Sequence, residues 1–479
     1  MAHRKNSKPR KLKGRTLNDE TATPKSNKLI ASSQKYNANS NASTKWTLTG
    51  IMISLAVAGL AYFWRAYSNR VEQLSTPLGR LMYHWPPGEA VTIQGTGSYR
   101  RVVATQRIQK GGVALSAEEV DLEGELLNEN PELKSLVDQM LPQVIQEQSA
   151  TLTTLTSSTK ILVMIRLLEL IDIQKNERWT AYADTLPENV TTVSWYWTPE
   201  ERNCTVPRPT EDWNLQDLRV FHAVMARLSE ASPLVQQIYS PQNATKRSRA
   251  EWALLMMKTR AFGNLYFLPI MDMINHNALQ AISPFSSNHR EYLVAARDIE
   301  PGEQVYNNYG ELSPMHCLEM YGFVPSEAEA AYFEVPSIQE DLWHSPWTKA
   351  HPECTKDQGA RFFGNVGHYE TVEAEFERLK KATTFKAYMP TRTAPACMRA
   401  MLQSQTNDTD LARYVASKLQ YDHDRYDAMA QAPHCQSNDA NFPLIRQANQ
   451  VTAWLLKNAH QVADAAANDA SIPYPRKAK

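Results

Sequence analysis

The spacing of apolar residues beyond about residue 75 first indicates strands. Short apolar runs broken by glycines are typical of strands that end in turns, and they occur in two groups. The runs lie at 91–94, 102–106 and 113–116, and again at 265–270, 292–296 and 304–306. The predicted strands are therefore split between two distant parts of the chain.

Helical spacing fills the interval between these groups and the C-terminal part of the chain. Residues 159–173 are apolar nearly all round, as in a buried helix. Other predicted helices lie at 215–228, 248–262, 372–381, 409–419 and 442–466. The order predicts an α+β fold. A split, β-rich domain at 76–325 holds a helical insert at about 122–250, and an all-helical domain follows at 326–479.

One segment near the N-terminus has a different character. Residues 46–64 contain no charge over nineteen positions, with Trp46 at one end and Trp64 at the other. A helix of that length reaches about 28 Å, close to the hydrocarbon thickness of a bilayer. The segment therefore predicts one transmembrane helix. A cleaved signal peptide fits less well, because bulky aromatic residues occupy the cleavage-site positions. A transit peptide is a further alternative.

The residues before this segment are strongly basic. Residues 1–45 hold eleven Lys and Arg against Asp19 and Glu20, a charge of +9 in a chain that is neutral overall. They are almost free of large apolar side chains, which predicts a disordered tail. The charge favours a cytosolic N-terminus, with everything after Arg65 across a membrane that the sequence does not identify. The basic run 4–15 indicates nuclear import or nucleic-acid binding only weakly.

The cysteines and the glycosylation sequons bear on the compartment. No two of the five cysteines are close enough to form a CxxC pair, so the sequence predicts no metal site. Disulfides among them would require an oxidising lumen. N-x-Ser/Thr sequons begin at Asn189, Asn203, Asn243 and Asn407. In a chain this rich in Asn, a few such sequons arise by chance.

Polar residues with chemistry of their own gather between 252 and 324. Asp272, Asn275 and His276 follow a strand-like run and end at a turn. Near 307–310, Tyr309 places an aromatic hydroxyl beside a glycine. Each piece alone is typical of a capping pair or a packed turn. Only their order and spacing together indicate a functional site.

That order resembles the SET half of the Rubisco large-subunit lysine methyltransferase family. The motifs are R-A-F at 260–262, P-x-x-D-x-x-N-H at 269–276, D-I-x-x-G-E at 298–303, N-Y-G at 308–310 and Y-G-F-V at 321–324. Residues 178–201 resemble the family's insert, where a W-x-x-Y-x-x-x-L-P run precedes a W-x-x-E element. The resemblance spans about 76–450. It implies a protein-lysine N-methyltransferase that uses S-adenosyl-L-methionine.

The resemblance also implies the role of individual residues. Those that would bind the cofactor or support its pocket are Arg260, Asp272, Asn275, His276 and Tyr309, and Tyr309 corresponds to the catalytic tyrosine. Those that would line the channel for the substrate lysine are Phe262, Tyr321 and Phe323. The helical C-terminal domain would bind the protein substrate. Methyl transfer from a sulfonium rests on alignment and on oxygen dipoles, so no metal is expected.

The sequence departs from the family in two places. Family members carry a G-x-G element just before a V-A-T-like strand, whereas 99–101 here are Tyr-Arg-Arg, and Gly95 and Gly97 lie four residues early. Ser313-Pro314 stands where the family often has Ser-Asn. These departures leave open a degenerate SET domain that acts as a membrane-tethered binding module. A protein-histidine methyltransferase is another alternative, since the related actin-histidine enzyme shares this architecture.

Overall fold

The computed structural model describes residues 74–95, 100–150, 153–188, 190–206, 213–262, 266–278, 283–287, 289–310, 312–344, 363–365, 408–439 and 441–468. The chain separates into two compact units, residues 1–69 and 70–479, and all described residues belong to the second. The tail 1–45 and the predicted transmembrane segment 46–64 lie outside the described residues. Within the described part, no helix combines the length and the apolar character needed to cross a membrane.

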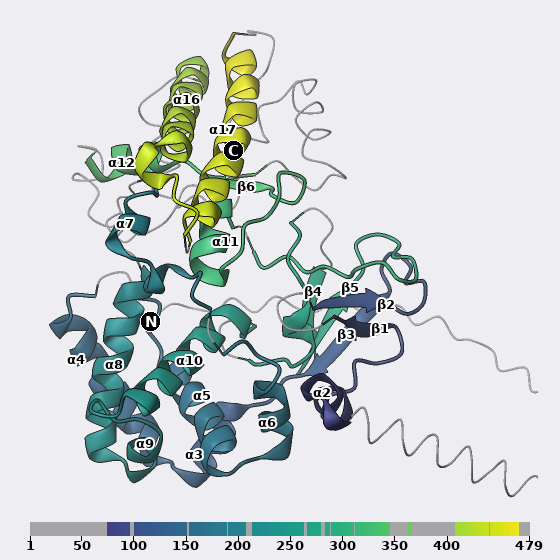
Figure 1. Ribbon diagram of the computed structural model, residues 1–479, viewed down its shortest axis with the longest axis vertical. Helices are drawn as coiled ribbons and strands as arrows, with labels where there is room; N and C mark the ends of the chain where they lie inside the picture. Colours follow the sequence, from purple (N-terminus) through teal and green to yellow (C-terminus); the bar gives the residue numbers. More distant parts are fainter. Residues whose placement is uncertain are drawn as a thin grey trace, which may run out of the picture. The chain divides into compact units, whose positions relative to one another are not determined.

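Strands from the two parts of the chain come together in space, although the strand at 283–287 was not predicted and the predicted strand at 304–306 forms only an isolated bridge, between Gln304 and Val103. The strands are β1 (Val91–Gln94), β2 (Arg101–Ala104), β3 (Val113–Glu118), β4 (Ser283–Ser287) and β5 (Arg290–Val294). β1 and β2 form an antiparallel pair, and a second antiparallel sheet has the order β3-β5-β4. Leu115 of β3 faces Leu293 of β5, and both side chains are buried. Strands that come before and after the helical insert therefore pair in one sheet, as the split pattern in the sequence predicted (Figure 1).

The insert between β3 and β4 is helical. After α2 (Pro77–His84) and β3, its helices are α3 (Leu122–Glu129), α4 (Glu132–Glu147), α5 (Ser158–Leu168) with a π-helical extension (Glu169–Ile173), α6 (Glu177–Ala183), α7 (Pro199–Arg202), α8 (Trp213–Ala231), α9 (Pro233–Ile238) and α10 (Ala244–Arg260). Every residue from Ile161 to Leu168 is at most 5% exposed, which confirms the predicted buried helix. The one charge in that stretch, Arg166, is paired with Glu169 at 2.9 Å and Glu129 at 3.1 Å. A buried charge needs such partners.

The strand predicted at 265–270 is wrong for the residues that the structure describes. Tyr266 forms only an isolated bridge with Phe262, and the chain then turns into a 3₁₀ helix, Met271–Met273. Pro269 has no backbone N–H to give to a ladder. Ile270 has φ 75°, a conformation that a β-branched residue adopts only under strain. Together these two residues redirect the chain just before Asp272.

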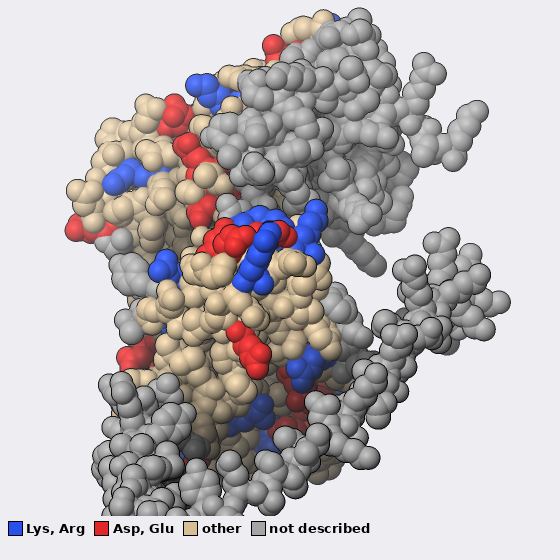
Figure 2. Space-filling view, turned by 90° about the vertical axis from the view of Figure 1, so that its right-hand side faces the viewer, with Lys and Arg blue, Asp and Glu red and all other residues tan. Residues whose placement is uncertain are grey.

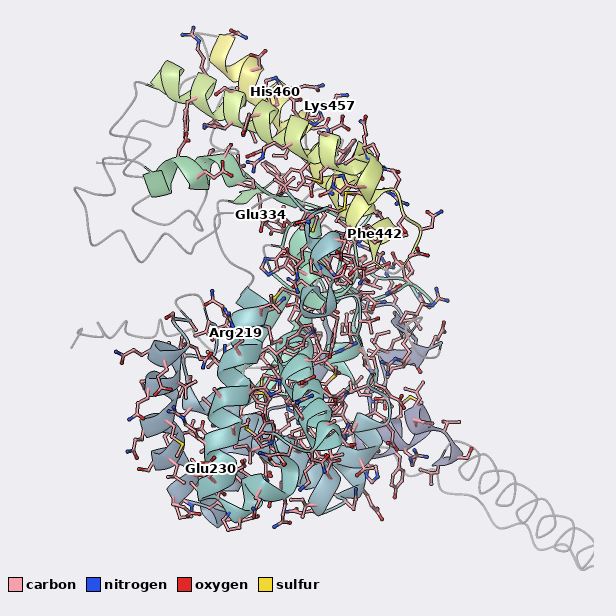
Figure 3. The ribbon with its side chains drawn as sticks, turned by 60° about the vertical axis from the view of Figure 1, so that its left-hand side comes forward. Arg219, Glu230, Glu334, Phe442, Lys457 and His460 are labelled. Carbon is pink, nitrogen blue, oxygen red and sulfur yellow. A yellow bond between two sulfur atoms is a disulfide. The ribbon has the colours of Figure 1, made fainter. Side chains whose placement is uncertain are left out.

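The C-terminal part contains the helices predicted at 409–419 and 442–466, two further helices, and one small sheet where an all-helical domain was predicted. The helices are α11 (Pro314–Tyr321), α12 (Pro336–His344), α16 (Asp408–Gln431) and α17 (Phe442–Asn468), and the sheet pairs β6 (Tyr332–Glu334) with β7 (Phe363–Asn365). The long helices α16 and α17 lie side by side (Figure 1), and His460 Nδ1 lies 2.9 Å from the Ala416 carbonyl oxygen. Figure 3 labels Phe442 near the start of α17 and His460 farther along it. The predicted helix at 372–381 lies outside the described residues.

Charges of both signs mix on the face shown in Figure 2. Among the surface ion pairs, Arg107 contacts Asp298 at 2.7 Å and Glu300 at 3.3 Å, and Arg297 contacts Glu303 at 2.7 Å. A nucleic-acid-binding surface instead carries a continuous patch of Lys and Arg. The described residues on the face in Figure 2 form no such patch.

Candidate functional site

Backbone pairing brings the two motif segments together. The Asn307 N–H donates to the Asn275 carbonyl at 2.9 Å, and the Asn277 N–H donates to the Asn307 carbonyl at 3.1 Å. These bonds form a parallel bridge between His276 and Asn307. The N-H motif and the N-Y-G motif, about thirty residues apart in sequence, therefore lie side by side.

Tyr309 is held at both its hydroxyl and its backbone. Its hydroxyl donates to the Ile274 carbonyl at 2.6 Å, and its backbone N–H donates to His276 Nδ1 at 3.1 Å. Burial raises the pKa of the Tyr309 phenol to about 12. The hydroxyl thus stays protonated at neutral pH. It keeps lone pairs free to act as a dipole, but it is not a base.

His276 is buried, and its imidazole is neutral. Burial lowers the pKa of His276 to about 4, so the ring carries no charge at neutral pH. Nδ1 accepts the Tyr309 N–H, which places the ring proton on Nε2. His276 therefore orients the Tyr309 backbone without placing a positive charge beside it.

Four rings form what we call the aromatic wall: His276, Tyr309, Tyr321 and Phe323. The Tyr309 ring centroid lies 5.2 Å from that of His276, 5.1 Å from that of Tyr321 and 6.3 Å from that of Phe323. Phe323 also lies 6.0 Å from His276 and 6.3 Å from Tyr321. Burial raises the pKa of the Tyr321 hydroxyl as well. All four rings are therefore neutral, and aromatic faces of this kind attract cations.

Three charged residues lie close together beside the N-H motif, in what we call the charged wall: Arg100, Arg260 and Asp272. Arg260 donates to the Asp272 backbone carbonyl at 2.8 Å. The Asp272 carboxylate is buried. One of its oxygens accepts the Tyr182 hydroxyl at 2.7 Å, and the other has no hydrogen-bond partner in the described structure. Burial raises the pKa of Asp272, while the charges of Arg260 and Arg100 oppose that rise.

Asn275 and Arg100 connect the charged wall to β2. The Asn275 side-chain amide donates to the Arg100 carbonyl at 3.1 Å, and Asn275 itself is exposed. The Arg100 guanidinium lies 3.8 Å from the Met273 sulfur, and burial lowers the pKa of Arg100. Of the residues 99–101, where the sequence departs from the family's G-x-G element, Tyr99 lies outside the described residues, whereas Arg100 and Arg101 are described. Arg100 itself therefore contributes a backbone acceptor and a side chain to the site.

Phe262 is the one predicted site residue placed apart from the aromatic wall. Its backbone exchanges two hydrogen bonds with Tyr266, at 2.8 and 3.1 Å, and its side chain packs against the main hydrophobic core. It makes none of the ring contacts that join the other aromatic residues of the described site. Of the other predicted residues, Asn275 bonds to Arg100 and the rest belong to the two walls.

Sequence reasoning missed Tyr182 and the Ile274 carbonyl. Tyr182 is fully buried, and its ring packs edge-on against Trp179 at 5.9 Å and Phe267 at 6.2 Å. It is the tyrosine of the W-x-x-Y run, so a signal was present in the sequence. A backbone carbonyl leaves no such signal, because any residue at position 274 supplies one.

Comparison with family models decides the class of this domain. Residues 99–310 match the model described as SET domain. This chain contains a SET domain. The match includes the helical insert, both motif segments and the charged wall, whereas Tyr321 and Phe323 of the aromatic wall lie just beyond its end. A comparison with curated proteins found no match.

Solved structures of SET proteins are similar to the chain at low identity. One is the SET domain of LSMT bound to lysine and AdoHcy, 13% identical, with a TM-score of 0.45, covering 83% of this chain and 92% of that one. Another is Rubisco LSMT bound to AdoMet, 14% identical, with a TM-score of 0.45, covering 82% and 91%. A third, Rubisco LSMT with sinefungin and monomethyllysine, is 14% identical, with a TM-score of 0.42, covering 80% and 89%.

Proposed function

We propose that this SET domain transfers a methyl group from S-adenosyl-L-methionine to a lysine side chain of a protein. The observation that carries the proposal is the meeting of the two walls at Asn275-His276. His276 belongs to the neutral aromatic wall, and the Asn275 amide bonds to Arg100 of the charged wall. Each wall suits a different part of one amphipathic donor.

The residues present fit the donor. Its sulfonium and transferable methyl suit the neutral rings and the Tyr309 oxygen, since aromatic faces and oxygen dipoles attract positive charge. Its amino-acid and nucleoside groups need hydrogen-bonding partners. The exposed Asn275 amide, the orphaned oxygen of Asp272 and the Arg260 guanidinium are of the right kinds. When bound, the donor supplies an electrophilic methyl group.

The chain's own residues would perform positioning and charge stabilisation. Tyr309, fixed at its hydroxyl and at its N–H, holds the Ile274 carbonyl and its own oxygen in place without reorganisation. Because its phenol has a pKa of about 12, Tyr309 does not remove the proton of the incoming ammonium. Instead, the substrate lysine would enter beside Tyr321 and Phe323, where apolar surroundings would lower its pKa, so that the lysine would lose its proton to water.

A direct test replaces Tyr309 in the purified full chain. Tyr309→Phe removes the oxygen dipole and keeps the ring, so we expect methyl transfer to fall about 100-fold or more while donor binding is retained. Tyr306→Phe is the matched control, because Tyr306 lies three residues earlier and outside the aromatic wall, and it should keep wild-type turnover. The measurement is transfer of labelled methyl to an extract, with modified residues located by mass spectrometry.

The outcomes of that assay separate the alternatives. Label on lysine that disappears in Tyr309→Phe supports the proposal. Tyr309-dependent label on histidine would favour a histidine methyltransferase instead. No label with wild type or with either variant would favour a binding module that does not transfer methyl groups. The arginine at position 100 also favours that alternative, because its side chain fills space that a glycine would leave open.

A further inference from the structure

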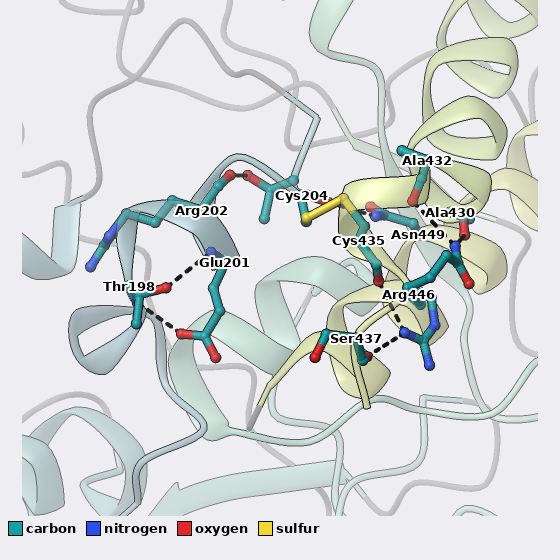
Figure 4. The surroundings of a disulfide bond; sticks show 12 residues. Thr198, Glu201, Arg202, Cys204, Ala430, Ala432, Cys435, Ser437, Arg446 and Asn449 are labelled. Carbon is teal, nitrogen blue, oxygen red and sulfur yellow. Dashed lines mark hydrogen bonds between the residues drawn. A yellow bond between two sulfur atoms is a disulfide. The ribbon is translucent and has the colours of Figure 1, made fainter. Parts of the chain in front are cut away.

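A disulfide joins two distant parts of the chain outside the SET site. Cys204 follows α7 in the insert, and Cys435 ends the short 3₁₀ helix Pro433–Cys435 between α16 and α17; 231 residues separate them (Figure 4). Both cysteines are at most 1% exposed. Asn449 of α17 donates to the Cys204 carbonyl at 2.8 Å, so the contact is fixed by hydrogen bonds as well. The bond therefore fastens the insert to the C-terminal helices.

The same atoms are a poorer metal site than a disulfide. Cys204, Cys435 and His434 bring three ligand atoms within 4.8 Å of one another. A structural zinc ion takes four protein ligands, and the described residues around these three offer no fourth His, Cys or carboxylate. His434 is also exposed, whereas the two sulfurs are enclosed. Oxidation of the two thiols is the chemistry that this arrangement suits.

Two glycosylation sequons stand on the surface of the same unit. Asn203 directly precedes Cys204 and is exposed at the C-terminal end of α7. Asn243 is exposed at the start of α10, where its side-chain oxygen accepts the Lys246 N–H at 3.1 Å. That bond engages the oxygen and not the amide nitrogen, which is the atom that carries an N-glycan. Both asparagines are exposed, and an N-glycan is a bulky surface group.

We propose that the SET domain and C-terminal helices fold in the oxidising lumen of a secretory compartment, with Asn203 and Asn243 glycosylated and Cys204 bonded to Cys435. A luminal disulfide oxidant would take two electrons and two protons from the thiols and be reduced to a dithiol. In glycosylation, the asparagine nitrogen bonds to the anomeric carbon of a lipid-diphosphate oligosaccharide, losing a proton as the lipid diphosphate leaves. The +9 tail before the predicted anchor agrees with this topology, since such charge stays cytosolic.

The proposal does not depend on methyl-transfer activity, because the sequons and the disulfide lie outside both walls. The test expresses the full chain in eukaryotic cells and traps free thiols at lysis with a maleimide. We expect wild type to lose mass on treatment with an N-glycosidase, and Thr205→Ala and Thr245→Ala each to lack one increment of that mass. Both changes destroy a sequon without altering its asparagine.

Thr205→Ser and Thr245→Ser are the matched controls, since serine preserves each sequon and should retain the increment. Glycans are added to chains that are still unfolded, so a folding defect in a variant does not remove them. The same sample should yield a Cys204–Cys435 linked peptide without reductant, while Cys317, free and buried, reacts with maleimide only after denaturation. A wild-type chain with no glycosidase-sensitive mass, or with maleimide on Cys204 and Cys435, would overturn the proposal.

Discussion

The aromatic wall and the charged wall both border the segment 272–276, yet they are built in contrasting ways. The aromatic wall is neutral, and the Tyr309 hydroxyl and the His276 imidazole each bond to a backbone group. The charged wall retains a buried carboxylate oxygen with no hydrogen-bond partner in the described structure. A neutral surface whose polar groups are hydrogen-bonded suits the methyl-transfer step, whereas a buried polar group without a hydrogen bond destabilises the fold unless a ligand supplies its partner. The contrast assigns alignment of the reactants to the aromatic wall and binding of the donor to the charged wall.

Gly322 offers the most severe way to break the aromatic wall. It lies between Tyr321 and Phe323 with φ 76°, and a Cβ there would come within 2.0 Å of the Thr192 side-chain oxygen. We expect Gly322→Ala to lower the free energy of unfolding by about 3 kcal/mol or more, through backbone strain plus overpacking, and to abolish activity. Chemical denaturation and turnover measure both effects.

Gly302→Ala separates strain from clash. Gly302 has φ 84° with nothing near its missing Cβ, so alanine there should cost only about 1 kcal/mol. Equal losses in the two alanine variants would mean that contact with the insert does not shape the aromatic wall.

The neutrality of His276 can be tested by pH. Its pKa is about 4 in the folded chain, against about 6.5 when unfolded, so the unfolded state binds the extra proton first as pH falls. Stability should therefore fall between pH 6.5 and pH 4, by about 3 kcal/mol from this group. Denaturation at several pH values in wild type and His276→Gln measures the difference in slope. Exposed His434 is the control, and His434→Gln should keep the wild-type slope.

A further test concerns the charged wall. Tyr182→Phe removes the one side-chain hydrogen bond to the Asp272 carboxylate and should cost about 1–3 kcal/mol of stability. Because Asp272 then loses its orientation, donor affinity should fall while turnover of bound donor changes little. Titration of donor binding and saturation kinetics test the two halves of this expectation. As a control, Tyr196→Phe changes a residue outside both walls and should leave donor affinity and turnover unchanged.

Local sequence patterns predicted the helices and the split sheet, but they failed where long-range contacts decide the structure. The run 159–173 is apolar nearly all round, so the sequence alone predicted that this helix is buried. The run at 265–270 looked like a strand because apolar content cannot reveal the positive φ of Ile270. The pairing of Cys204 with Cys435 joins residues 231 positions apart, and spacing alone carries no information about such a pair.

The site divides along similar lines. Tyr309, Tyr321, Phe323 and His276 were predicted through motif order, and the structure places their rings together. Phe262 came from the same motifs, yet its side chain packs into the core. Motif order fixes where the backbone passes. The direction of a side chain depends on neighbours that the motif does not contain.

Whether the two walls form one donor site is tested most directly by calorimetric titration of the full chain with S-adenosyl-L-methionine. The Asn275→Ala variant is titrated in parallel. If the two walls form one donor site, wild type should bind with a dissociation constant below about 1 mM, and Asn275→Ala should bind at least several-fold more weakly. No heat from folded wild-type protein at millimolar donor, or equal affinity in the variant, would contradict the account.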